Sequence, residues 1–207
     1  MASRAAPAPR ALLFDIGRVI VRVDVNRALG ALGAGAGLSA AEVWAAIQAD
    51  PRWRDWQEGR IEPRNWHLHL AQRFGVSLSF EEFCAVWNGS LDPETVLQED
   101  LFARLAGRYR LGLLSNTDPI HVAHLEANFS FVRHFPARVY SCRAGACKPD
   151  PAIYGRAIER LGMPADQVLY TDDSPEYVEA GRRAGMQAIV FENAEQLLVE
   201  LRQRGIV

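Results

Sequence analysis

The sequence predicts an α/β fold: a central parallel sheet of about five strands, helices on both faces, and a helical insertion after the first strand. From residue 93 onward, short apolar runs of strand length alternate with helix-length stretches that carry one apolar face. This rhythm is typical of βαβ units and of a parallel sheet. Between the first apolar run and this alternating part, residues 25–92 carry helix signals only. We therefore expect a core built from residues 11–24 and 93–207, with residues 25–92 forming an inserted helical cap.

The first predicted strand is the run Leu12-Leu13-Phe14, which ends on the carboxylate Asp15. Gly17 follows two residues later and allows a sharp turn. In open α/β sheets the carboxyl ends of the strands face the ligand, so Asp15 is a candidate site residue. Residues 19–23 are again β-branched and are expected to form a small hairpin or flap beside Asp15. Residues 1–10 are rich in Ala and Pro, contain no signal-peptide core, and are expected to be a disordered lead.

The helical insertion contains three helix starts that can be recognised from the sequence. Ser39 and Ser79 each stand three residues before a glutamate, the pattern of a capping box. Pro63 fits the first position of a further helix. Apolar residues recur at three- and four-residue spacing after each start. No strand is expected within residues 25–92.

The second half of the chain supplies the other layers of the core. Asp150-Pro151 and Ser174-Pro175 pair an N-cap residue with a proline at the first helical position. Helices are expected at 97–105, 120–128, 150–161, 174–185 and 194–204, and strands at 111–114, 139–140, 168–170 and 188–191. Strands separated by helices in this order imply a three-layer, Rossmann-like core.

Composition narrows the class of partner. Among 207 residues, 25 acidic and 23 basic side chains nearly balance, and no Lys/Arg block stands out. Nucleic acid and anionic membrane surfaces are therefore not expected as partners, and no apolar run reaches the length of a membrane span. We expect a cytoplasmic protein. Cys84, Cys142 and Cys147 lack the spacing of a metal site and are expected to be reduced structural thiols.

Polar residues follow each predicted strand, and parallel strands bring these ends to one edge of the sheet. Three carboxylates, a lysine and small polar groups meet there: Asp15, Ser115, Asn116, Lys148, Asp172 and Asp173. The carboxylates together can hold a hard divalent cation such as Mg²⁺, and the lysine offsets repulsion between an anionic nucleophile and an anionic substrate. Asp172 and Asp173 could instead cap the helix that begins at Ser174-Pro175, although capping needs only one of them. Lys148 could instead be an ordinary solvated surface lysine.

Four segments in order resemble the motifs of the haloacid dehalogenase superfamily of phosphohydrolases. They are FDIG at 14–17, LLSNT at 113–117, KPDPAIY at 148–154 and YTDDS at 170–174. The resemblance covers essentially the whole chain from residue 11, and residues 25–92 are similar in place and size to the first type of cap in that family. Gly17, with LSNT and KPDPAIY, is most similar to the branch of small sugar-phosphate phosphatases, which includes glucose-1-phosphate phosphatases and the phosphatase domain of soluble epoxide hydrolases.

The resemblance implies roles for the acidic residues. Asp15 would be the nucleophile, forming an aspartyl-phosphate that water hydrolyses. Mg²⁺ would be held by Asp15, the backbone carbonyl of Gly17 and Asp173. Asp172 would be either a further ligand or a residue that contacts the ligands without binding the ion. The expected reaction is hydrolysis of a small phosphorylated metabolite, by a monomer or a homodimer.

The resemblance also implies a phosphate site. Ser115 and Lys148 would bind the transferred phosphoryl group, with Asn116 close to the substrate. Arg18 stands where the family commonly has a small residue, so it either adds a phosphate contact or narrows the entrance.

Gly17 is the main departure from the family, whose phosphatases usually carry an aspartate there as general acid and base. Loss of such assistance typically costs about 10²–10⁴-fold in rate. The enzyme could compensate for this loss in two ways. In the first, the leaving group departs without early protonation, as in an anomeric, acyl or aryl phosphate. In the second, another group delivers the proton, such as Asp24, His67 or a substrate hydroxyl.

The cap is expected to select the substrate. Most of its aromatic residues are expected to be cap core: Trp53, Trp56, Trp66, His67, His69 and Trp87. Residues 57–61 either face the site, as a glycine-containing turn does in similar caps, or form an ordinary turn between helices.

Two other functions are compatible with the same motifs. A 2-haloacid dehalogenase would also use Asp15 as nucleophile, but its fourth motif normally has Ser or Asn where this chain has Asp172-Asp173. That pair would repel a carboxylate substrate unless a cation neutralised it. A non-catalytic regulatory or binding module is suggested by Gly17 and opposed by the retained Asp15, Lys148 and acidic pair.

Overall fold

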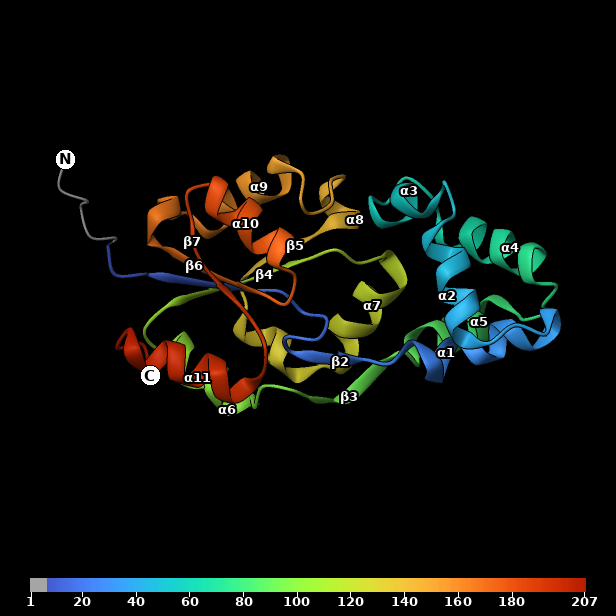
Figure 1. Ribbon diagram of the computed structural model, residues 1–207, viewed down its shortest axis with the longest axis horizontal. Helices are drawn as coiled ribbons and strands as arrows, with labels where there is room; N and C mark the ends of the chain where they lie inside the picture. Colours follow the sequence, from blue (N-terminus) through green and yellow to red (C-terminus); the bar gives the residue numbers. More distant parts are fainter. Residues whose placement is uncertain (1–6) are drawn as a thin grey trace.

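The central sheet has five parallel strands in the order β5-β4-β1-β6-β7, in a computed structural model that describes residues 7–207 (Figure 1). β1 (Ala11–Phe14) lies in the middle and is buried on both faces, pairing with β4 (Arg110–Ser115) and β6 (Val168–Asp172). β5 (Ala137–Tyr140) and β7 (Gln187–Val190) form the edges. The predicted α/β class, with a parallel five-stranded sheet, is confirmed.

Helices cover both faces of this sheet. α9 (Pro151–Leu161) and α10 (Pro175–Arg183) pack on the face that receives Leu13. α6 (Glu99–Ala106), α7 (Pro119–Asn128) and α11 (Ala194–Gln203) pack on the face that receives Leu12 and Phe14. Successive side chains of β1 therefore enter opposite layers, as the period of a strand requires. Three short helical segments complete the connections: η2 (Ser130–His134), α8 (Ser141–Ala144) and η3 (Ala165–Gln167).

Residues 25–88, here called the helical unit, lie beyond the carboxyl ends of the sheet strands (Figure 1). They fold into six helical segments: α1 (Val25–Gly33), η1 (Ala34–Ala36), α2 (Ala40–Gln48), α3 (Trp53–Gln57), α4 (Pro63–Phe74) and α5 (Phe80–Asn88). Both predicted capping boxes form, at Ser39 and at Ser79. The helices share a separate apolar cluster centred on the buried Trp56 and Trp66.

A two-stranded antiparallel ribbon joins the helical unit to the core. β2 (Val21–Val23) pairs with β3 (Leu91–Thr95), so the flap expected beside Asp15 pairs with a distant segment. The prediction that residues 25–92 contain no strand is wrong at their carboxyl end. The segment Leu-Asp-Pro-Glu-Thr has no β-branched run, and it is held extended by its partner strand, which local propensity does not reveal.

Part of the predicted disordered lead is attached to the core. Pro7 accepts a hydrogen bond from Gln187 Nε2 (2.7 Å), and the Arg10 N–H donates to the Gln167 carbonyl (2.8 Å). Residues 1–6 of that lead lie outside the described residues.

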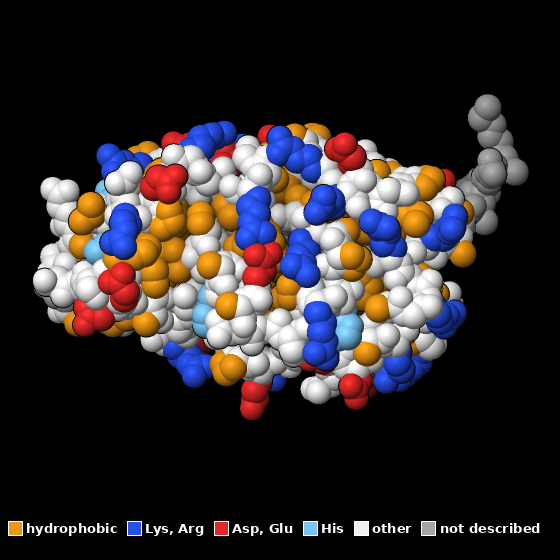
Figure 2. All heavy atoms as spheres, turned by 180° about the vertical axis from the view of Figure 1, so that it is seen from behind, with side chains coloured by type: hydrophobic (Ala, Val, Ile, Leu, Met, Phe, Trp, Pro, Cys, Tyr) orange, Lys and Arg blue, Asp and Glu red, His pale blue; other side chains and the backbone are white. Residues whose placement is uncertain are grey.

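Basic side chains are spread over the surface shown in Figure 2, with acidic and apolar groups between them. This distribution agrees with the near balance of charges in the sequence. Within residues 7–207, no helix combines the length and the apolar character needed to cross a membrane.

Candidate active site

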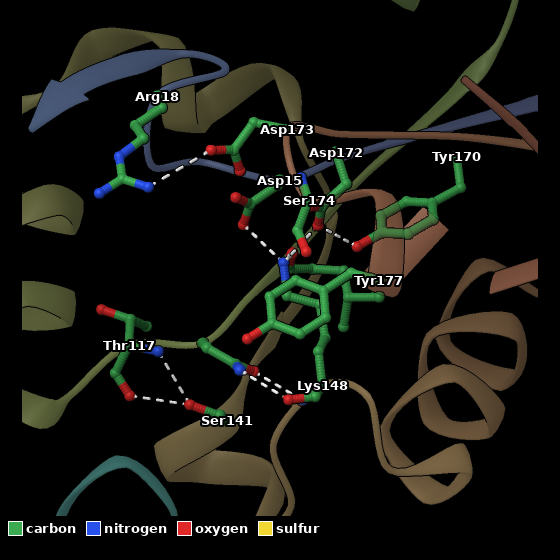
Figure 3. Close-up of polar contacts among 12 residues, drawn as sticks. Asp15, Arg18, Thr117, Ser141, Lys148, Tyr170, Asp172, Asp173, Ser174 and Tyr177 are labelled. Carbon is green, nitrogen blue, oxygen red and sulfur yellow. Dashed lines mark hydrogen bonds and ion pairs between the residues drawn. The ribbon is translucent and has the colours of Figure 1, made fainter. Parts of the chain in front are cut away.

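Lys148 lies between two buried carboxylates at the carboxyl edge of the sheet (Figure 3). Its Nζ is 2.9 Å from Oδ1 of Asp15 and 2.6 Å from Oδ2 of Asp172, and it also donates to the Leu114 carbonyl at 3.3 Å. Asp15 follows β1, and its own N–H donates to the Thr171 carbonyl of β6 (2.9 Å). All three charged side chains are almost fully buried. The sheet therefore brings the predicted nucleophile, lysine and acidic motif into direct contact.

Asn116 fixes the loop that carries Lys148. The amide Nδ2 donates to the Lys148 carbonyl (3.0 Å), and Oδ1 accepts the Lys148 N–H (2.7 Å). Tyr177, on the first turn of α10, places its ring 4.9 Å from Nζ of Lys148. One N–H of the Asn116 amide and its carbonyl oxygen thus hold the backbone of Lys148, and Asn116 also lines the cavity described below.

The two aspartates of the fourth motif have different surroundings. Asp172 is fully buried and accepts hydrogen bonds from Lys148, from the Tyr170 hydroxyl and from the Ser174 N–H (2.8 Å). Asp173 is only half-buried, and its Oδ2 lies 3.6 Å from a guanidinium nitrogen of Arg18.

Burial and charge shift the pKa values of the central groups. Burial raises the pKa of Asp15 to about 6; the positive charge of Lys148 acts in the opposite direction, and Asp172 raises it further. Burial lowers the pKa of Lys148, but the charges of Asp15 and Asp172 outweigh it, so that this pKa is raised and the lysine remains a cation. The pKa of Tyr170 is raised well above its ordinary value by burial and by Asp172. One buried cation thus faces two buried carboxylates, with Asp173 next to them.

The carboxylates fit a hard divalent cation. Asp15, Asp172 and Asp173 each offer an oxygen, and these oxygens lie within 4.8 Å of one another. Oδ1 of Asp15 is buried and accepts no well-directed hydrogen bond, although Lys148 forms an ion pair with it. The oxygens of Asp172, in contrast, are occupied by protein donors. Proteins usually bind Mg²⁺ through oxygen atoms of one or two carboxylates. Asp15 and Asp173 are the two carboxylates of this cluster that have oxygens available for a cation.

A cavity of about 330 Å³ adjoins this cluster, between the core and the helical unit. The core contributes Gly17, Arg18, Ser115 and Asn116 to its wall, so four predicted site residues line it. Gly17 has no positive φ, and a Cβ placed there would meet only Val23 Cγ2, at an ordinary 3.5 Å. The glycine is therefore not required by the backbone.

The two side chains considered as substitute acids lie elsewhere. His67 is buried in the helical unit, where its Nε2 lies 2.8 Å from the Leu78 carbonyl and its ring packs on Phe83. Asp24 is exposed and caps α1 by accepting from the Asn26 N–H (2.9 Å). Neither belongs to the cavity wall, so the structure does not support either of them as the group that delivers the proton.

The aromatic residues of the helical unit divide between core and cavity. Trp56 and Trp66 stack in its core, as expected, and His69 pairs with the buried Asp50 (2.7 Å). Trp53 and Trp87 line the cavity.

The turn that contains Gly59 rests on the core. Gly59 has φ +72°, and a Cβ there would lie 2.0 Å from the Cys142 carbonyl oxygen. Beside it, the Gln57 carbonyl accepts a hydrogen bond from Ser141 Oγ (2.7 Å), and the same hydroxyl accepts from the Thr117 N–H (2.8 Å). Gln57 also lines the cavity. The turn is therefore more than a link between helices: it docks the helical unit beside the second motif.

Several residues of the site were not singled out in the sequence. Asp118 caps α7 and accepts from Trp87 Nε1 (2.9 Å), while His121 Nδ1 lies 2.9 Å from the same carboxylate. Trp44 and Tyr177 also line the cavity. Asp118 directly follows the second motif, a signal that could have identified it, whereas the direction of Trp44 follows only from how α2 packs.

The three cysteines are free thiols, half-buried or buried. Burial raises the pKa of Cys142 to about 12 and that of Cys147 to about 11. Both remain protonated near neutral pH, in agreement with a structural role.

Comparisons with known proteins identify the family. Residues 9–185 match the haloacid dehalogenase-like hydrolases. The chain is similar to D-ribitol-5-phosphate phosphatase from Bacteroides thetaiotaomicron, with 24% identity over 92% of this chain and 95% of that protein. It is also similar to flavin mononucleotide hydrolase 1 from Arabidopsis thaliana, with 30% identity over 74% of this chain and 62% of that protein. A haloacid dehalogenase family enzyme from Bacteroides thetaiotaomicron, solved with magnesium and inorganic phosphate, superimposes with a TM-score of 0.80 at 23% identity, covering 90% of this chain and 96% of that one. The chain belongs to the haloacid dehalogenase-like hydrolase family.

Proposed function

We propose that this protein is a Mg²⁺-dependent phosphatase that hydrolyses a small phosphomonoester through an aspartyl-phosphate on Asp15. The observation that carries the proposal is the charge arrangement: Lys148 is in contact with Asp15 and Asp172, and Asp173 adds a third carboxylate within 4.8 Å. Such a cluster has an excess of negative charge that a divalent cation balances. The relatives described as phosphatases support the reaction class.

In the first step, a carboxylate oxygen of Asp15 attacks the phosphorus of the substrate. A bond forms between that oxygen and phosphorus, and the bond from phosphorus to the ester oxygen breaks, with its electron pair going to the departing oxygen. Lys148 places a fixed positive charge beside the nucleophile and the phosphoryl oxygens, which reduces the repulsion between two anions.

In the second step, water attacks the phosphorus of the aspartyl-phosphate. Phosphate leaves with the new oxygen, the Asp15 carboxylate is regenerated, and the proton lost by water passes to solvent. Because Gly17 has no side chain, the departing oxygen of the first step takes its proton from water. The reaction is then fastest for alcohols that are stable as anions.

Asp15, Asp173 and the Gly17 carbonyl would hold the Mg²⁺ ion, whose charge would stabilise the phosphoryl oxygens. Asp172 contributes by positioning Lys148, because its oxygens already accept three protein hydrogen bonds. Of the two roles that the sequence left open for Asp172, its hydrogen bonding favours this one.

The phosphoryl group would lie against Ser115, at the carboxyl end of β4, with the Asn116 amide beside it. Arg18 is exposed at the cavity and paired with Asp173, a place from which its guanidinium can bind a phosphate oxygen. Residues 25–92 would act as the cap that closes this cavity over the substrate.

The dehalogenase alternative is disfavoured by the same cluster. A haloacid carries its own carboxylate, which would enter beside three aspartates and one lysine. No side chain near Asp172-Asp173 other than Lys148 and Arg18 forms an ion pair with this cluster in residues 7–207.

Phosphate release from a panel of sugar, alkyl and aryl phosphates, measured with Mg²⁺ and with EDTA, tests the proposal. We expect turnover only with Mg²⁺ and a loss of at least about 10³-fold in Asp15→Asn, because the nucleophile is removed. Asp166→Asn is the matched control, since Asp166 is exposed at the opposite end of β6. No turnover of any phosphate by the wild type, or full activity in Asp15→Asn, would show the proposal to be wrong.

A further inference from the structure

The cavity beside Asp15 has two chemically different ends. Its polar end is formed by the phosphate site of the core, with Arg18, Ser115 and Asn116. Beyond it, the wall is built largely from apolar side chains of β2 and the helical unit: Val23, Val25, Leu29, Trp44, Trp53 and Trp87. In a bound phosphomonoester, the phosphoryl group would occupy the polar end and the alcohol would face this apolar wall.

The polar side chains of the apolar end are largely paired with one another. Asp118 accepts from Trp87 Nε1 and faces His121 Nδ1, both at 2.9 Å. The second ring nitrogen of His121 lies 3.1 Å from the Trp87 carbonyl, and Ser90 Oγ donates to the same carbonyl (2.9 Å). Gln57 and the exposed amide of Gln48 remain to receive substrate hydroxyls. Each polyol hydroxyl that is buried there without a partner would cost about 1–3 kcal/mol.

Two tryptophans give this end a preference for flat, apolar groups. Trp44 and Trp53 are both half-buried, their ring centres are 5.5 Å apart, and their planes are nearly perpendicular at 84°. Trp53 is backed by the buried Trp66 (6.1 Å), which restricts its movement. Partly exposed indole faces on a concave wall are suited to an aromatic ring, which they contact edge-to-face or offset.

The chemistry at Gly17 points to the same kind of alcohol. Without a general acid, the first step favours a leaving oxygen that is stable as an anion. A phenolic oxygen has a pKa of about 10, against about 15.7 for bulk water. The bond from phosphorus to such an oxygen breaks with the electron pair on oxygen, and the phenolate then takes a proton from water. The absent acid and the apolar wall are independent features of the structure.

We propose that the substrate is the phosphomonoester of an apolar aromatic alcohol, held by Trp44 and Trp53. This inference rests on the proposed phosphatase function and replaces the sugar phosphate suggested by resemblance. It assigns Trp44 and Trp53 as residues that determine specificity for the alcohol, apart from the groups that bind phosphate.

A comparison of benzyl phosphate with ribitol 5-phosphate tests the proposal in the wild-type enzyme. Both are esters of primary alcohols, so the acidity of the leaving group differs little and the contrast reports on the cavity wall. We expect kcat/KM for benzyl phosphate to be at least about tenfold higher, since tenfold corresponds to 1.4 kcal/mol, within what burying one apolar group supplies. Phenyl phosphate, with its more acidic leaving group, is expected to be faster still.

Variants separate the cavity wall from the phosphate site. Trp53→Ala and the milder Trp44→Leu are expected to lower kcat/KM for benzyl phosphate about tenfold, mainly through KM, with a clearly smaller loss on ribitol 5-phosphate and unchanged inhibition by inorganic phosphate. Leu68→Ala, which removes a 61% exposed side chain from the same helical unit, is the control. Preference for ribitol 5-phosphate, or equal losses on both substrates, would overturn this inference and leave the phosphatase proposal standing. Absence of turnover on every phosphate would overturn both.

Discussion

Replacing Gly17 with aspartate should add a general acid to the proposed active site. The structure has room for the change, because a Cβ at residue 17 would meet only Val23 Cγ2 at 3.5 Å and the backbone φ is not positive. We therefore expect little loss of folding stability. General acid catalysis contributes about 10²–10⁴-fold, or about 2.7–5.4 kcal/mol of barrier at 1.36 kcal/mol per decade. Part of this gain is lost because a fourth carboxylate joins Asp15, Asp172 and Asp173, so an increase of about tenfold or more is expected for alkyl phosphates.

The assay is kcat with saturating Mg²⁺ for a series of phosphate esters whose alcohols differ in pKa. In the wild type, log kcat should fall steeply as the pKa of the alcohol rises. In Gly17→Asp the slope should flatten, with alkyl phosphates gaining and aryl phosphates changing little. Gly17→Asn is the matched control, because it has the same shape and no carboxyl proton. An unchanged slope in Gly17→Asp, or an equal flattening in Gly17→Asn, would refute the argument that a missing acid limits this enzyme.

Three further predictions concern stability. Gly59→Ala should lower the thermal unfolding midpoint more than Gly75→Ala. Both glycines have positive φ, which costs about 1–2 kcal/mol for alanine, but only at Gly59 would the Cβ collide with the Cys142 carbonyl. Equal shifts of the midpoint would contradict the close contact between the Gly59 turn and the core. Burial lowers the pKa of His121, but the charge of Asp118, the hydrogen bond with Asp118 and the hydrogen bond with the Trp87 carbonyl together outweigh burial, so this pKa is raised. The raised pKa stabilises the folded state fully below the ordinary histidine pKa of about 6.5, and this contribution is lost as the pH rises through the raised value. The difference in unfolding free energy between wild type and His121→Gln, from urea titrations, should therefore shrink as the pH rises above about 6.5; a difference that grows would contradict the charged pair. Mg²⁺ should raise the unfolding midpoint and EDTA should reverse the rise, because a ligand that binds only the folded state stabilises it; an unchanged midpoint would contradict the cation site.

The sheet and the position of Asp15 could be predicted because they depend on local patterns. A short apolar run that ends on a carboxylate indicates a strand end, and alternation with helices implies that such ends converge. β3 (Leu91–Thr95) could not be predicted, because its residues are extended through pairing with β2 rather than through their own propensity.

Which side chains of the helical unit face the site also lay beyond the sequence. His67 and Trp53 are both aromatic residues at positions compatible with a helix core, yet one packs inside the unit and the other lines the cavity. The hydrophobic period identifies a buried face of a helix but not the neighbour against which that face packs. Asp118 contacts His121, three residues later on the helix that it caps, and Trp87 of α5. Its position after the second motif gave no indication of the contact with Trp87.

Mapping the covalent intermediate tests the central claim most directly. The wild-type enzyme, mixed with benzyl phosphate and Mg²⁺, is quenched in acid within a single turnover, digested, and its peptides are analysed by mass spectrometry. We predict a phosphoryl group on Asp15 of the peptide that carries β1, absent when Mg²⁺ is withheld and absent in Asp15→Asn. A phosphoryl group on any other residue, or phosphate release with no phosphorylated peptide at any time of quenching, would contradict the account.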